Sequence, residues 1–440
     1  MHVFLETYGC QMNEYDSELV RAILRDGSFR MTASPEDADV VLLNTCAVRE
    51  HAHQKIYGRL HGIGELKRRN PRLVVGILGC MAQSLKKQLL EKNPVVDLVA
   101  GPDSYKKLPR LIRAVCDGGG KGLEIGLSEY ETYSDVYPER VPGVNAWIAC
   151  MRGCDNFCAF CVVPYTRGRE RSREPDRIVE EARRLAAQGF KQVTLLGQNV
   201  NSYRYEGTDF ADLLRRVAAV DGLQRLRFTS PHPKDFPRRL LHAIASHSKL
   251  CKQIHLPLQA GDDRVLSMMR RTYTQQEFLD LVDEIRAAIP QVCLSTDLIA
   301  GFPTETEAEF EATVAVLERV QFDSAFIFKY SERPNTIAQR RHRDDVPEEV
   351  KTRRVVCLNE LQKAISLRRN RAWIGRIVDV LVEGPSRKSG DDLIGRDDAN
   401  HGVVFPCEDL RPGDLVRVEV LDASAHTLIG RALKPRASDS

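Results

Sequence analysis

Short apolar runs alternate with amphipathic segments through the first part of the chain. Residues 3–7, 40–43 and 74–78 are dominated by aliphatic side chains, and segments with helical periodicity separate them, as in residues 17–26 and 84–92. Buried strands that alternate with helices are typical of an α/β unit with a parallel sheet. The pattern therefore predicts an N-terminal α/β domain over residues 1–116.

Residues 117–143 show neither the helical nor the strand periodicity of hydrophobic positions and contain three consecutive glycines, which predicts a linker. A longer series of alternating strands and helices follows the linker. Six strand candidates come next, starting near Val144, Gln192, Arg225, Gln253, Val292 and Ala325. The clearest intervening helix covers residues 175–188, with proline in its first turn and glycine just beyond its end. We predict a partial (β/α)6 barrel over residues 144–370, with its active face at the carboxyl ends of the strands.

The pattern changes again near the C-terminus. Short alternating runs at residues 377–381, 402–404, 414–420 and 427–432 are separated by turn residues such as Pro412-Gly413-Asp414. This region, residues 373–436, is predicted to form a small antiparallel β-barrel. The fold class is therefore α/β with a C-terminal β-barrel.

Composition narrows the class of protein. The chain has 440 residues, of which 42% are hydrophobic and 28% charged, as in globular proteins. Its apolar runs are too short to span a membrane, and its first residues do not resemble a signal peptide, so we expect a cytoplasmic protein without a membrane partner. Twelve cysteines in a reducing compartment indicate metal or redox chemistry rather than disulfides.

Three cysteines lie close together in the middle of the chain. Cys154, Cys158 and Cys161 have the spacing Cys-x3-Cys-x2-Cys, in a loop after the first strand of the predicted barrel. Thiolates held close together by a short loop suit an iron–sulfur cluster, and three of them leave one iron open. The alternative is a zinc site, but structural zinc usually has four ligands and a local fourth is missing here.

Three further cysteines follow strands of the N-terminal domain. Cys10, Cys46 and Cys80 each come one or a few residues after an apolar run, at intervals of 36 and 34 residues. The carboxyl ends of parallel strands share one edge of a sheet, so these cysteines are expected to converge as a second three-ligand site. Alternatively, they are three structural cysteines of the core.

The central spacing, at the start of a partial barrel, resembles the radical S-adenosylmethionine (SAM) enzymes. The resemblance implies that the open iron binds SAM and that cleavage of SAM yields a deoxyadenosyl radical. It also implies contacts to this cofactor from the aromatic residue before the last cysteine and from strand ends of the barrel. These residues are Phe160, Gly197, Gln198, Asn199, Ser230 and Gln259.

The order of domains resembles the methylthiotransferases over nearly the whole chain, with a C-terminal barrel similar to the TRAM domain. This implies two 4Fe–4S clusters, the second on Cys10, Cys46 and Cys80 carrying the sulfur, and two SAM molecules. The sequences of residues 8–18 and 161–173 are similar to those of one branch of this family. That branch methylthiolates carbon 2 of N6-isopentenyl (dimethylallyl) adenosine at position 37 of tRNA. Thr304 and Asn335 stand where that family commonly has glycine.

Basic residues near the central triad indicate where RNA could bind. Arg167, Arg169, Arg171 and Arg173 alternate, so an extended segment would place all four on one face, suited to tRNA phosphates or bases. The alternatives are a solvated charge run or an internal ion-pair network. The C-terminal region from residue 373 has nine basic and twelve acidic residues, so binding there requires a local patch, for which we name Arg387 and Lys388.

The resemblance also implies partners. These are a tRNA carrying N6-isopentenyladenosine, a flavodoxin- or ferredoxin-like electron donor, and a sulfur donor. We expect a monomer. Two other hypotheses stay open from the sequence: the same chemistry on threonylcarbamoyl-adenosine, and a metal-stabilised RNA-binding protein without catalysis.

Overall fold

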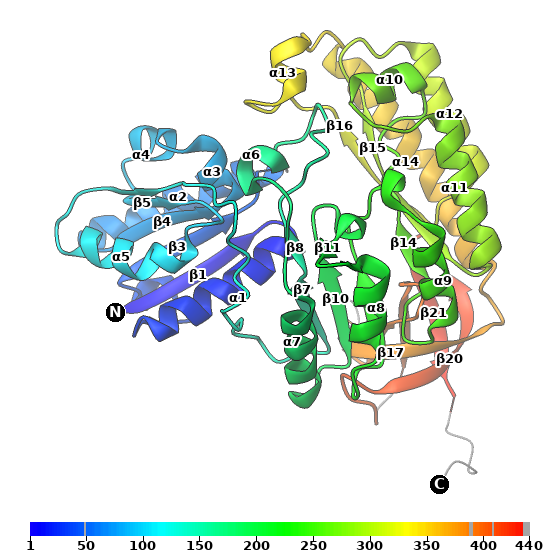
Figure 1. Ribbon diagram of the computed structural model, residues 1–440, viewed down its shortest axis with the longest axis horizontal. Coiled ribbons are helices and arrows are strands. Elements are labelled where there is room, and N and C mark those ends of the chain that lie inside the picture. The colour runs from blue at the N-terminus through cyan, green and yellow to red at the C-terminus, as the bar shows by residue number, and fades with distance from the viewer. Residues whose placement is uncertain (48–49, 387–389, 407–408, 434–440) are drawn as a thin grey trace.

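The computed structural model describes residues 1–47, 50–386, 390–406 and 409–433. The chain forms an N-terminal α/β unit, a larger α/β unit and a small barrel, seen at the left, the right and the lower right of Figure 1. This confirms the predicted architecture. Every helix among the described residues is too short or too polar to cross a bilayer.

The N-terminal unit is built on a parallel sheet with the strand order β2-β1-β3-β4-β5-β6. Its strands are β1 (His2–Tyr8), β2 (Arg30–Met31), β3 (Val40–Thr45), β4 (Val74–Gly79), β5 (Leu98–Ala100) and β6 (Gly122–Glu124). Its helices are α1 (Gln11–Asp26), α2 (Glu50–Arg69), α3 (Cys80–Leu85), α4 (Gln88–Lys92) and α5 (Leu108–Cys116). Every residue of β3 and β4 is buried, which explains their uninterrupted apolar sequences.

Part of the predicted linker belongs to this unit. β6 pairs with β5 and extends the sheet, and Tyr133 is fully buried against Tyr105, with its hydroxyl donating to Pro102 O at 2.8 Å. A strand of three residues has no readable period, because its conformation depends on pairing with a neighbour that is distant in sequence.

The central unit is a partial barrel of six parallel strands. They are β7 (Asn145–Ala149), β10 (Gln192–Leu196), β13 (Arg225–Phe228), β14 (Gln253–His255), β15 (Cys293–Ala300) and β16 (Ser324–Lys329). Two groups of three strands, joined by a bridge between Leu226 and Leu250, give the order β7-β10-β13-β14-β15-β16. The strands match the six predicted positions.

Helices cover the outside of this barrel (Figure 1). They are α7 (Pro175–Ala187), α8 (Phe210–Ala218), α9 (Arg238–Ser246), α10 (Asp263–Met268), α11 (Gln275–Ala288), α12 (Glu307–Val320) and α14 (Glu348–Arg371). α7 matches the predicted helix within one residue. Its buried side chains include Ile178, Ala182 and Leu185, which lie on the face that packs on the core.

The C-terminal unit is a closed barrel with the order β17-β18-β19-β21-β20. Its strands are β17 (Ile377–Pro385), β18 (Asp392–Arg396), β19 (Gly402–Pro406), β20 (Leu415–Ala423) and β21 (Thr427–Ala432). The predicted all-antiparallel pairing is wrong at one place, because β19 and β21 pair in parallel. The sequence also missed β18, in which Gly395 lies against β17: a Cβ there would lie 2.3 Å from Leu381 O.

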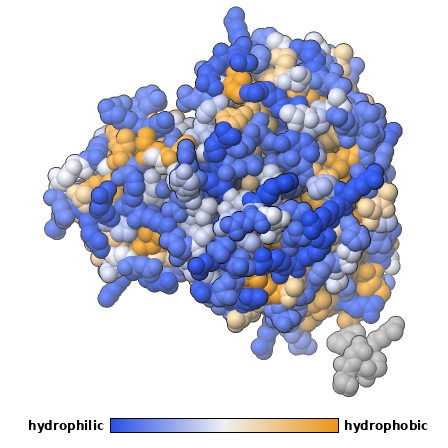
Figure 2. Space-filling model, viewed as in Figure 1, coloured by the Kyte–Doolittle hydropathy of each residue, from blue (hydrophilic) through white to orange (hydrophobic). Residues whose placement is uncertain are grey.

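Polar contacts hold the three units together and set the position of the site. Arg140 pairs with Glu18 of α1 and with Glu181 of α7. At the amino end of β13, Arg225 donates to Asp379 O at 2.6 Å, and Arg227 donates to Asp398 O at 3.2 Å. The C-terminal barrel therefore contacts the amino ends of the strands, while Arg152, just beyond the carboxyl end of β7, pairs with Asp16 of the N-terminal unit. The side of the molecule in Figure 2 is mostly hydrophilic, with apolar residues in small separate groups.

Candidate active site

The three N-terminal cysteines come from adjacent strands. Cys10 follows β1 and precedes α1, Cys46 follows β3, and Cys80 begins α3 directly after β4. β1, β3 and β4 are neighbours in the sheet, so the cysteines meet at one edge. Gly79, the last residue of β4, has a φ of +86°, and a Cβ there would lie 2.4 Å from Asn44 Oδ1, so only glycine fits directly before Cys80.

Electrostatics distinguish these thiols from one another. A hydrogen bond from Cys46, assisted by the positive charge of Arg167, lowers the pKa of Cys10 to about 6. Burial raises the pKa of Cys80, although Arg167 Nε lies 3.2 Å from its Sγ and acts in the opposite direction. Arg167 therefore provides positive charge to a site where thiolates would gather.

The central cysteines lie on the loop between β8 (Met151–Arg152) and α6 (Val163–Arg167). Gly153 starts this loop with a φ of +78°, and a Cβ there would lie 1.9 Å from Arg169 O. Burial raises the pKa of Cys154 to about 12, and burial and the neighbouring thiols raise that of Cys161. The buried Arg271 lies beside them, with Nη1 3.4 Å from Cys158 Sγ.

Donor spacing separates the two metal hypotheses for these cysteines. Among the described residues, the one group of three or more donors that all lie within 4.8 Å of one another is Cys293, Asp323 and His401, so neither cysteine triad is that compact. A single zinc ion needs a tighter set of ligands than a cluster of four irons and four sulfides. Three sulfurs held further apart, beside buried guanidinium groups, fit an iron–sulfur cluster better than zinc.

One cavity of about 1760 Å³ runs through the barrel and reaches both cysteine sites. Cys10 and Cys46 of the N-terminal set and Cys161 of the central set line it, whereas Cys80, Cys154 and Cys158 are not among its lining residues. Predicted cofactor residues that also line it are Phe160, Ser230 and Gln259. Contact between the sites is direct, because Val162 packs in one apolar cluster with Cys80 and Ala47. Small-molecule sites usually occupy about 300–1,000 Å³, so this cavity has room for a cofactor together with a nucleoside.

The predicted cofactor residues fall into two groups. Ser230 and Gln259 have φ values of +59° and +73° at their strand ends and line the cavity with Phe160. The other three, Gly197, Gln198 and Asn199, follow β10 and are not among the lining residues. The Asn199 side chain instead donates to Asp235 Oδ2 at 2.8 Å, and Gly197 packs on Met151, where a Cβ would lie 2.8 Å from Met151 Cγ.

The expectation that four alternating arginines share one RNA-binding face is wrong. Arg167, Arg171 and Arg173 are buried and pair with Asp16, Asp103 and Glu181 at 2.7–2.8 Å. Arg167 ends the α6 helix, so the segment is not one extended strand. The alternative of an internal ion-pair network is correct for these three. Arg169 is exposed and pairs with Asp155, and Arg387 and Lys388 lie outside the described residues.

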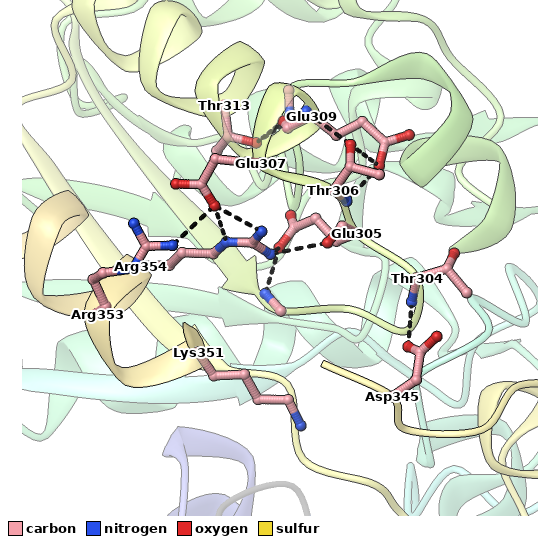
Figure 3. A network of polar contacts seen from close by, with 12 residues as sticks. Thr304, Glu305, Thr306, Glu307, Glu309, Thr313, Asp345, Lys351, Arg353 and Arg354 are labelled. Atoms are coloured by element: carbon pink, nitrogen blue, oxygen red, sulfur yellow. Dashed lines mark hydrogen bonds and ion pairs between the residues drawn. The ribbon is translucent and has the colours of Figure 1, made fainter. Parts of the chain in front are cut away.

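A network of carboxylates and guanidinium groups supports the strand end after β15 (Figure 3). Arg354 of α14 is buried and bonds to Glu305 at 2.8 Å and to Glu307 at 3.0 Å, and Glu305 also accepts from Gly301 N. Thr304, with a φ of +65°, donates its backbone N–H to Asp345 Oδ1 at 2.7 Å. Asn335 likewise has a φ of +68°. Both departures from glycine thus fall on left-handed backbone, which glycine adopts with least strain.

Some residues of the site lie in segments that the sequence singled out, but their partners could not be predicted from it. Asp16 is fully buried and accepts from both Arg152 and Arg167, which links the two cysteine sites. Inside the cavity, His255 Nε2 lies 3.2 Å from Asp297 Oδ2. A buried charge becomes recognisable only with its partner, and these partners are distant in sequence.

The lowered pKa of Cys10 predicts a pH profile for alkylation. In protein without clusters, the Cys10 thiolate fraction rises through pH 6 and is nearly complete by pH 8, because its pKa is about 6. We expect its rate of labelling by iodoacetamide to level off there. Cys116 is the control: its side chain is largely exposed, and partial desolvation and the negative charge of Asp117 raise its pKa, so its labelling should still rise above pH 9. Peptide mass spectrometry measures both. Parallel profiles would contradict the assignment.

Comparison with known proteins agrees with the architecture. Residues 2–101 match an uncharacterised protein family, UPF0004, residues 148–317 match the Radical SAM superfamily, and residues 371–433 match the TRAM domain. Among solved structures, the radical SAM methyltransferase TsrM from Kitasatospora setae superimposes with a TM-score of 0.60 at 17% identity, covering 77% of this chain and 75% of that one. At this identity the likeness shows the fold.

Sequence relatives are far closer. The tRNA-2-methylthio-N(6)-dimethylallyladenosine synthase of Chloroherpeton thalassium is 48% identical, and the match covers 98% of this chain and 96% of that protein. The protein of the same name from Porphyromonas gingivalis is 47% identical, with 99% and 96% covered. From its full-length similarity and its three matched domains, the chain belongs to the family of radical SAM tRNA-2-methylthio-N(6)-dimethylallyladenosine synthases.

Proposed function

We propose that this chain attaches a methylthio group to carbon 2 of N6-dimethylallyladenosine at position 37 of tRNA. The observation that carries the proposal is the shared cavity, which reaches both cysteine sites. A transfer of sulfur to an unactivated carbon needs a site that generates a radical and a site that supplies sulfur, both within reach of one base. The name of the relatives, which specifies dimethylallyladenosine in tRNA, supports the choice of acceptor.

Each cysteine site has a proposed cofactor. Cys154, Cys158 and Cys161 would hold one 4Fe–4S cluster and Cys10, Cys46 and Cys80 a second. When bound, these clusters and SAM supply the reducing electron, the radical and the sulfur. Two SAM molecules per product, a flavodoxin- or ferredoxin-like electron donor and a sulfur donor are part of the proposal.

The chain's own residues prepare these sites. Arg167 beside Cys80 and Arg271 beside Cys158 place buried positive charge next to sulfur, which favours thiolates. Phe160 gives the cavity an aromatic wall that suits a purine. The barrel strands and α14 supply much of the remaining lining, including Thr194, Asp297 and Lys351.

The RNA would reach the cavity from the surface. Arg169, Arg340 and Arg341 are exposed, and Arg340 donates to Tyr165 Oη at 3.0 Å near the radical loop. These side chains suit contacts to tRNA phosphates. A contribution from Arg387 and Lys388 of the TRAM domain remains a prediction.

The test is mass spectrometry of nucleosides from tRNA incubated with cluster-reconstituted enzyme, SAM and reductant. We expect 2-methylthio-N6-dimethylallyladenosine from tRNA that carries dimethylallyladenosine, and no methylthio product from tRNA with unmodified adenosine. Methylthiolation of threonylcarbamoyl-adenosine instead would show that the acceptor is different. Protein with zinc in place of iron and no cleavage of SAM would favour a non-catalytic RNA-binding protein.

A further inference from the structure

A second group of metal-binding side chains lies at the junction of the central and C-terminal barrels, far along the strands from the six cysteines above. Cys293 is the first residue of β15, Asp323 directly precedes β16, and His401 lies between β18 and β19. All three line the cavity, on the side of the amino ends of β15 and β16. The two domains thus contribute to one group, and the predicted function does not use it.

The geometry of the group suits a tetrahedral metal ion. One donor atom from each of Cys293, Asp323 and His401 lies within 4.8 Å of the others, and Cys293 Sγ is 3.5 Å from His401 Nε2. A sulfur at about 2.3 Å and a nitrogen at about 2.0 Å from a tetrahedral zinc ion lie roughly 3.5 Å apart. The thiol and imidazole are therefore already spaced as zinc ligands.

His401 is oriented by a neighbour. Its Nδ1 lies 2.8 Å from Asp397 Oδ2, its backbone N–H donates to Asp397 Oδ1 at 2.7 Å, and its ring packs edge-on against Trp373. A histidine whose Nδ1 donates to a carboxylate presents the lone pair of Nε2, here toward Cys293. A carboxylate behind a histidine ligand is the usual support of a zinc-bound imidazole.

Charge also favours a divalent cation. Asp323 accepts hydrogen bonds from Leu294 N and Arg369, which leaves its oxygens further lone pairs for a metal. With the thiol ionised, Cys293, Asp323 and Asp397 place three negative charges around the site, and the guanidinium groups of Arg369 and Arg286 lie near Asp323. Negative charge is therefore in excess, and a divalent cation would compensate it.

We propose that Cys293, Asp323 and His401 bind a zinc ion at the junction between the C-terminal barrel and the base of the radical barrel. The fourth coordination position opens to the cavity and takes water. A thiolate with an imidazole selects zinc over magnesium or calcium, which prefer sets of oxygen ligands. The ion would fix the orientation of the C-terminal domain relative to the site where the base reacts.

The test uses the full chain with both clusters reconstituted, so that the six cluster cysteines are occupied, and treated with a chelating resin. Zinc is then titrated against a chromophoric chelator. We expect one zinc per chain beyond the iron in the wild type, and none in Cys293→Ala or His401→Ala. Asp397→Asn should retain zinc with about 10–100-fold weaker affinity, because only the support of His401 is lost.

Cys357→Ala, which removes an exposed cysteine of α14, is the matched control and should bind zinc like the wild type. Added zinc should raise the thermal midpoint of the wild type and of this control but not of Cys293→Ala. Equal zinc content in the wild type and Cys293→Ala at equal iron content would overturn the proposal. So would wild-type protein that binds no zinc, or an affinity unchanged by Asp397→Asn.

Discussion

Replacing Cys154 with alanine is expected to abolish reductive cleavage of SAM, whereas replacing Cys46 should leave cleavage intact and abolish sulfur transfer. The two residues lie on different elements, Cys154 in the loop after β8 and Cys46 after β3. Each proposed cluster has only three protein ligands, so one substitution removes a third of them. The rate of SAM cleavage in the Cys154 variant and the rate of sulfur transfer in the Cys46 variant should both fall to the uncatalysed background.

Chromatography of 5′-deoxyadenosine measures cleavage, and nucleoside mass spectrometry measures sulfur transfer. Each variant should also hold about half of the roughly eight irons expected for two 4Fe–4S clusters. Cys150→Ala is the matched control, because this buried thiol lies beside the central loop and bonds to Leu196 O instead. Identical behaviour of the Cys154 and Cys46 variants would refute the division of labour between the two sites.

Asp16→Ala should have the largest effect on stability of any single substitution considered. The Asp16 carboxylate is fully buried and pairs with Arg152 and with Arg167, at 2.8 Å from the latter. Its removal leaves two buried cations without their anion, and breaking such a buried pair costs about 3–5 kcal/mol. Because Arg167 also lies beside Cys80, the variant should lose iron from the N-terminal site as well.

Urea titration followed by circular dichroism measures this change, with iron content determined on the same samples. The control is Glu348→Ala, whose partner Lys329 and own side chain are 43% and 62% exposed, so a change of about 0.2–1 kcal/mol is expected. Asp16→Asn keeps the side-chain volume and should still be destabilised. If Asp16→Ala unfolds at the same urea concentration as Glu348→Ala, the buried network does not stabilise the junction.

The arginines near the central loop show where reasoning from sequence failed. Alternation along an extended segment predicts a shared face, but α6 ends at Arg167 and Gly168 turns the chain, so the alternation has no common face. Three of the four side chains then meet carboxylates of α1, α7 and the loop after β5. Sequence periodicity indicates which face of a segment is buried. It does not indicate which carboxylate, distant in sequence, will pair with a given arginine.

Local patterns in the chain were enough to predict the three-domain order, the parallel strands that precede Cys10, Cys46 and Cys80, and the loop that carries Cys154, Cys158 and Cys161. Each of these depends on local periodicity or on short spacing, which a chain shows without its partners. The folded structure was needed to find that one cavity reaches both cysteine sites, that Arg167 lies beside Cys80, and that Cys293 contacts His401 of another domain. Such meetings depend on strand pairing and domain packing between residues far apart in sequence, where no local pattern records the contact.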